Sequence, residues 1–137
     1  MTTFARMIAF LLGLAVAACS FLPWVGSATA WNLRLVSLVS PGRGHDVVAA
    51  ASLGLGLCVS ATVLALGALL NSRTLVIVGG LVSVALPTIW ILGNAVASDV
   101  GVPLSQVEIG AYGAAAAGLM TLVLAAVAAD TRVPSAR

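Results

Sequence analysis

Four long apolar runs without a charged side chain are the feature that most restricts how this 137-residue chain can fold. They cover residues 7–25, 47–70, 74–97 and 109–129, and each is long enough for a helix that crosses a bilayer. Apolar residues are consecutive within the runs, whereas the strands of a membrane β-barrel alternate apolar and polar positions. The sequence therefore predicts an all-α fold: a single domain, residues 1–137, that is a polytopic membrane bundle of four transmembrane helices with a longer first outer loop.

The small number of charged residues excludes several classes of protein. Charged side chains make up 7% of the chain, compared with about 25% in an ordinary soluble domain. A chain this apolar cannot cover a water-facing surface, which argues against a soluble enzyme or a soluble nucleic-acid-binding domain. The net charge of +2 is too small for nucleic-acid binding or for a polybasic lipid-binding role. The sequence thus predicts the lipid bilayer as a partner and no nucleic acid.

The basic residues, all of them arginines, divide unevenly between the two sides of a four-span layout. The side with the termini carries Arg6, Arg73, Arg132 and Arg137, and the opposite side carries Arg34 and Arg43. The positive-inside rule therefore predicts that both termini are cytoplasmic and that residues 26–46 and 98–106 lie outside. Trp24 and Trp31 flank the outer end of the first run, where aromatic residues favour the membrane interface.

The first run has an alternative interpretation as a lipoprotein signal. Arg6 would supply the positive region, residues 7–15 the apolar region, and Val16–Cys19 resembles a lipobox whose cysteine is lipidated. The apolar run continues beyond this motif without a polar tether, and three more long runs follow, so a retained first span is favoured. Cys19 and Cys58 then both lie inside spans, as buried thiols rather than as an outer disulfide or a metal site.

Residues 26–46 form the longest segment between two apolar runs. Trp31, Leu35 and Leu38 recur there at helical spacing, as in an amphipathic helix that lies in the membrane interface. Trp31, Leu33 and Leu35 also alternate as in a short strand. Both alternatives stay open at this point.

Ionisable residues gather on the predicted outer side: His45, Asp46, Asp99 and Glu108. Such a set would suit a divalent cation, a proton relay or a membrane enzyme that uses the histidine. Each residue also has a local explanation. Ser105–Glu108 matches a capping box at the start of the fourth helix, and Asp46 is placed to cap the second. Since no pair has ligand spacing on one helix, we expect no metal, no cofactor and no catalytic residue.

Asn94 is the strongly polar residue within the runs, one turn before the outer end of the third. With Glu108 it is a candidate for lining a transport path, although hydrogen bonding to a neighbouring helix is the more usual role. Pro87 predicts a kink in the middle of the third run. The spans carry no Asp, Glu, Lys, Arg or His, which counts against a proton-coupled pump.

Small residues four positions apart are the most repeated pattern in the second and fourth runs. In lipid, such rows let helices approach closely. Two adjacent rows on the fourth run suggest two packing partners, within the bundle or on another protein. The predicted helix-packing interface consists of Gly54, Gly56, Ser60, Gly110, Gly113, Ala114, Ala117 and Gly118.

The lysine-free chain, rich in Ala, Val, Leu and Gly and with Leu22–Pro23–Trp24 closing the first run, resembles the small four-span envelope membrane proteins of actinobacteria, mycobacteria included. Some of these serve as accessory subunits of larger envelope machines such as lipid transporters. The resemblance implies a non-enzymatic accessory or structural subunit in the plasma (inner) membrane, with other integral membrane proteins or a second copy as partners. The alternative is a small homo-oligomeric transporter or channel, motivated by Pro87 and Asn94.

Overall fold

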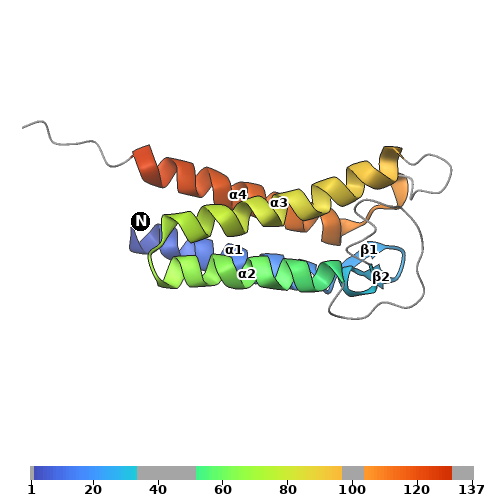
Figure 1. Ribbon diagram of the computed structural model, residues 1–137, viewed down its shortest axis with the longest axis horizontal. Helices are drawn as coiled ribbons and strands as arrows, with labels where there is room; N and C mark the ends of the chain where they lie inside the picture. Colours follow the sequence, from blue (N-terminus) through green and yellow to red (C-terminus); the bar gives the residue numbers. More distant parts are fainter. Residues whose placement is uncertain (1, 34–51, 97–103, 131–137) are drawn as a thin grey trace, which may run out of the picture.

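The computed structural model describes residues 2–33, 52–96 and 104–130 (Figure 1). Most of this part is helical, as the sequence predicts. The helices are α1 (Thr3–Cys19), α2 (Leu53–Leu69), α3 (Arg73–Val96) and α4 (Ile109–Asp130). The short elements are β1 (Pro23–Val25) and β2 (Ala28–Thr29), which pair as an antiparallel hairpin, and the 3-10 helices η1 (Ala30–Asn32) and η4 (Leu104–Gln106).

The four helices pack side by side in an up-down-up-down arrangement. Each packs mainly against two others, so the order around the bundle is α1, α2, α3, α4 and back to α1. Figure 1 shows the N-terminus, the α2–α3 turn and the C-terminal end of α4 at one end of the bundle, and the β-hairpin at the other. We call these the N-terminal end and the hairpin end.

The observed helix bounds agree with the predicted runs at α3 and α4 and differ at α1. The first helix begins at Thr3 and ends at Cys19, well before residue 25. It stops there because Pro23 has no N–H to donate and its ring disfavours helical backbone at Leu22. Pro23–Val25 forms strand β1 instead. The prediction of one continuous helix over 7–25 is therefore wrong, while the first five residues of the predicted span 47–70 lie outside the described part.

The turn between α2 and α3 is compact because its backbone groups are paired. Asn71 adopts a left-handed φ of 54°, and the next amide, that of Ser72, donates to the Gly67 carbonyl over 2.8 Å. This is the Schellman pattern that ends many helices. Gly67 permits the close return of the chain, since a Cβ there would lie 2.7 Å from the backbone nitrogen of Val76.

The distribution of side-chain size is inverted relative to a soluble bundle. Many buried positions carry small residues, such as Ala9 of α1, Gly67 of α2, Ser83 of α3 and Ala114 of α4, together with larger residues such as Leu57, Trp24 and Trp90. Large apolar side chains cover the outside of every helix. Exposed examples are Phe4, Met7 and Leu11 on α1, Val59 and Leu66 on α2, Leu81 and Ile89 on α3, and Leu119 and Val123 on α4.

Two of the helices are long and apolar enough to cross a membrane, namely Arg73–Gly93 within α3 and Ile109–Ala128 within α4. The apolar helices α1 and α2 have 17 residues each. Length and composition of the described helices thus identify two candidate spans, against four expected from the apolar runs.

Candidate functional site

Trp24 anchors the hairpin end of the interior. Its side chain is 0% exposed, and its indole Nε1 donates to the Cys19 carbonyl over 3.0 Å. The ring packs edge-on against Trp90 of α3, with 5.6 Å between centroids. Gly110 of α4 lies directly beneath it, because a Cβ there would be 2.5 Å from the Trp24 Cδ1 atom. The ring is therefore covered by the chain itself. Its place at the depth of a membrane interface stays a prediction.

Trp31 packs against a glycine of α2, as Trp24 packs against a glycine of α4. It belongs to η1, packs against Phe21 with 5.7 Å between centroids, and covers Gly54, where a Cβ would be 2.6 Å from the indole. The next residue but one, Leu33, is extended and accepts a hydrogen bond from the Leu53 amide over 2.8 Å. The chain from Trp31 to Leu33 is therefore not the start of an amphipathic α-helix. Leu35 and Leu38 lie outside the described residues.

The predicted packing residues of α4 face two neighbours. A Cβ at Gly113 would be 2.9 Å from the Cys19 Sγ atom of α1, and one at Gly118 would be 2.9 Å from the Val84 backbone nitrogen of α3. Ala114 and Ala117 are buried between these helices. The structure therefore brings both small-residue rows of α4 into contacts within the chain.

Hydroxyl groups pair in the interior between α2 and α3. The Oγ atoms of Ser60 and Ser83 are 3.1 Å apart, and each hydroxyl also lies 2.8 Å from a carbonyl of its own helix. Thr121 of α4 likewise donates to the Ala117 carbonyl over 2.9 Å. These buried polar groups are satisfied by the protein, which is the usual condition for their burial.

Most of the remaining predicted site residues lie outside the part of the chain that the structure describes. Gly56 is half-buried on α2. Asn94 belongs to α3, but its side chain lies outside the described part, as do His45, Asp46 and Asp99. Within the described ranges, no group of three His, Cys, Asp or Glu side chains is placed to hold a metal ion.

Glu108 has a different local role from the predicted one. The fourth helix begins at Ile109, and Ser105 lies in η4, so the predicted capping box with Ser105 as the cap is wrong. The Glu108 amide instead donates to the Trp24 carbonyl over 2.9 Å, and Val107 bridges Val25. These pairings tie the start of α4 to β1, and they replace the local hydrogen bonds that a capping box supplies.

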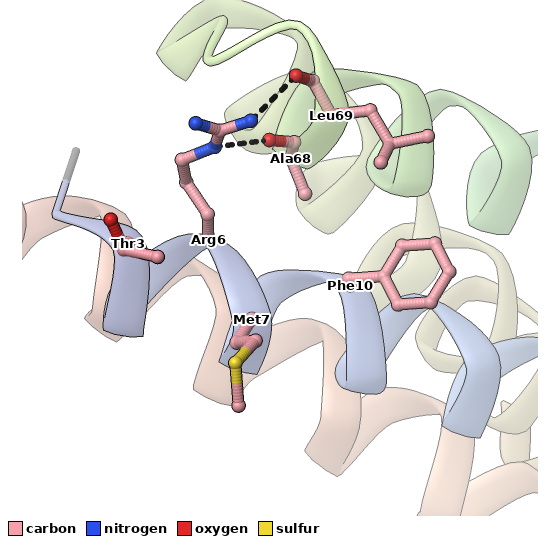
Figure 2. A pocket seen from close by; sticks show the side chains of 6 residues that line it. All are labelled: Thr3, Arg6, Met7, Phe10, Ala68 and Leu69. Carbon is pink, nitrogen blue, oxygen red and sulfur yellow. Dashed lines mark hydrogen bonds between the residues drawn. The ribbon is translucent and has the colours of Figure 1, made fainter.

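A pocket of about 300 Å³ lies at the N-terminal end between α1 and α2 (Figure 2). Arg6 crosses it: Nε donates to the Ala68 carbonyl and Nη2 to the Leu69 carbonyl, each over 2.8 Å. The rest of the lining is Thr3, Met7, Phe10 and the side chains of Ala68 and Leu69. From the sequence, Arg6 indicated orientation and supplied the positive region of the alternative lipoprotein signal, and no pocket around it was predicted. Its partners are more than 60 positions away, and no local pattern predicts them.

No protein-family model matches the chain, and comparisons with curated proteins and with solved structures give no match either. The resemblance to small actinobacterial envelope proteins thus rests on composition and layout.

Proposed function

We propose that the chain is a four-span membrane protein that acts as a non-enzymatic accessory or structural subunit, packing against a larger membrane complex of the cell envelope. Both termini are cytoplasmic in this proposal.

The inverted distribution of side-chain size supports four spans. Water would favour polar side chains on the outside, whereas membrane helices place small residues at their mutual contacts and large apolar ones toward lipid. The outward residues Met7 of α1 and Leu66 of α2 are as apolar as those of α3 and α4. A helix of 17 residues is about 26 Å long, which is close to the roughly 30 Å hydrocarbon thickness of a bilayer. Their length and apolar surface support the proposal that both short helices lie in the same apolar layer as the long ones.

The observation that carries the role of subunit is a tightly packed interior surrounded by apolar surface. At the hairpin end, Trp24 and Trp31 pack directly on Gly110 and Gly54. The interior hydroxyls of Ser60, Ser83 and Thr121 lie within hydrogen-bond distance of carbonyls of their own helices. Interior groups of this kind stabilise a bundle but offer little to a substrate. What the described part presents to other molecules is its outer surface, which in a bilayer meets lipid and neighbouring helices.

Photo-crosslinking in the native membrane tests the role of subunit. A benzophenone amino acid is placed, one site at a time, at the outward residues Leu11, Val59, Val82 and Leu119, one on each helix. We expect an adduct with one other membrane protein from one or two adjacent helices and not from the opposite side. Unirradiated samples serve as controls. Adducts with lipid alone from all four sites would contradict the proposal, and adducts of twice the chain mass alone would favour the homo-oligomeric transporter or channel.

Reporter fusions test the orientation separately. Arg6 and Arg73 lie at the N-terminal end of the bundle, and the positive-inside rule places this end in the cytoplasm. A reporter fused after Arg137 is expected to be active only in the cytoplasm, and one inserted at Gly42 only outside. The reverse pattern, or activity of both reporters on one side, would contradict four spans with cytoplasmic termini.

A further inference from the structure

We infer that the pocket beside Arg6 binds the phosphate of an anionic phospholipid headgroup. This inference rests on the membrane placement in the proposed function. It is independent of whether a protein partner exists.

The guanidinium of Arg6 is held in place with one edge free. An arginine carries five N–H donors, and the structure uses Nε and Nη2 for the carbonyls that end α2. Figure 2 shows the third nitrogen, Nη1, pointing away from these carbonyls on the side of the pocket where Thr3 lies. Nη1 has no partner in the described part of the chain. Because the two bonds fix the side chain, a ligand would meet an oriented donor rather than a mobile one.

The lining matches the boundary between headgroup and acyl chain. Thr3 contributes a hydroxyl to the lining, and Met7, Phe10 and Leu69 contribute apolar surface. A volume of about 300 Å³ is at the lower end for ligand pockets. It suits a headgroup phosphate with its first carbons better than a whole lipid. Charge-assisted bonds from arginine to phosphate are among the stronger hydrogen bonds in proteins.

The depth of the pocket agrees with this ligand. Arg6 is the fourth residue of α1, about 5 Å along the axis from its start. If α1 crosses the bilayer core as proposed, Arg6 lies near the boundary between the hydrocarbon and the headgroups. Arginine side chains at helix ends reach toward this layer. The cytoplasmic leaflet, where the proposal places this end, carries anionic lipid.

Lipid retention measured by native mass spectrometry tests the inference. The full chain is purified in mild detergent and offered phosphatidylglycerol or phosphatidylcholine with matched acyl chains. We expect phosphatidylglycerol to be retained about tenfold more strongly than phosphatidylcholine, because both carry a phosphate but the cationic choline of the latter offsets its negative charge beside Arg6. Equal retention of the two lipids would overturn the inference. Displacement of phosphatidylglycerol by millimolar inorganic phosphate would overturn it too, because the site would then be one for a soluble phosphate.

Two variants change the pocket in different ways. Arg6→Gln removes the charge, and Met7→Trp fills the space while leaving the bonds of Arg6 intact. Both are expected to bring the retention of phosphatidylglycerol down to that of phosphatidylcholine. Arg73→Gln, which removes an exposed arginine at the same end but outside the pocket lining, is the matched control and should retain the preference. Unchanged selectivity in Met7→Trp would contradict the inference even if Arg6→Gln fails to fold.

The outcomes separate this inference from the proposed function. Resistance to alkaline extraction reports membrane insertion of every variant, and the crosslinking experiment reports partners. Loss of lipid selectivity in a chain that still inserts and still crosslinks assigns the effect to the pocket. Insertion without lipid preference would overturn the lipid site alone.

Discussion

Gly110 lies so close to Trp24 that a Cβ at the glycine would meet the indole Cδ1 at 2.5 Å and the Pro23 carbonyl at 2.7 Å. The contact joins residues 86 positions apart and fixes the start of α4 against β1. The Glu108 amide, which donates to the Trp24 carbonyl, reinforces the same junction. One indole, one missing side chain and one backbone hydrogen bond therefore contribute to the junction between α4 and β1.

Gly110→Ala is expected to destabilise the bundle by about 1–3 kcal/mol, the range for overpacked cores. The added methyl cannot be accommodated unless Trp24 or the backbone at Pro23 shifts. Reversible unfolding in mixed micelles measures the loss. Ala116→Leu adds a larger side chain at an exposed position of the same helix and is the control. If both variants unfold alike, the close contact at Trp24 does not limit stability.

Gly118→Ala and Gly113→Ala are expected to differ, although both add one methyl to α4. At Gly118 the methyl meets the Val84 backbone nitrogen at 2.9 Å, so a helix must move. At Gly113 it meets only the Cys19 Sγ atom. Replacing a helical glycine by alanine also stabilises the helix by up to about 1 kcal/mol. Thermal unfolding in detergent should show a clear loss for Gly118→Ala and little change for Gly113→Ala.

The double variant Gly113→Ala with Cys19→Ala checks the cause at Gly113. Removing the sulfur makes room for the added methyl, so the double variant should be at least as stable as Cys19→Ala alone. A further loss of stability from Gly113→Ala in the Cys19→Ala background would place the obstruction elsewhere.

Ser60 and Ser83 are expected to be coupled through their 3.1 Å contact. In a double-mutant cycle with alanine, the interaction free energy should be about 0.6 kcal/mol, the average for such bonds between membrane helices. The coupling is modest because a hydroxyl has a single proton, so the serine that donates across the contact gives up the bond to the carbonyl of its own helix. Ser60 paired with Thr121, whose hydroxyl bonds to Ala117, is the control cycle and should give a value near zero. Equal values in the two cycles would contradict a direct contact.

Arg6→Met is expected to loosen the C-terminal turn of α2. The variant removes charge-assisted bonds to two carbonyls, a loss of about 1.5–3 kcal/mol if both bonds form in the bilayer. Hydrogen exchange of residues 64–76 should accelerate, while exchange in α4 stays slow. Arg73→Met is the control, because the Arg73 side chain makes no such contact with the described residues. Unchanged exchange in the α2–α3 turn would show that water or lipid replaces the guanidinium at these carbonyls.

Prediction from sequence succeeded where the signal is local and long. The uncharged runs at α3 and α4 could be predicted as helices from the runs alone, because a helix forms its backbone hydrogen bonds within its own segment. Spacing by four positions places small residues on one helix face, and Gly113 and Gly118 of α4 lie against α1 and α3. Prediction failed at Ser105. A Ser-x-x-Glu motif is short, so it occurs by chance and can be overruled by contacts far along the chain, such as the hydrogen bond from the Glu108 amide to the Trp24 carbonyl.

The sequence by itself determined that the described part is mostly helical and that its surface is apolar, because composition and run length alone decide whether a segment can face water. Only the tertiary structure decided which residues meet. The seating of Trp24 on Gly110, the pairing of Ser60 with Ser83 and the reach of Arg6 to the end of α2 depend on how the helices turn toward one another. That rotation is set by packing of the whole bundle, a property that no single helix encodes.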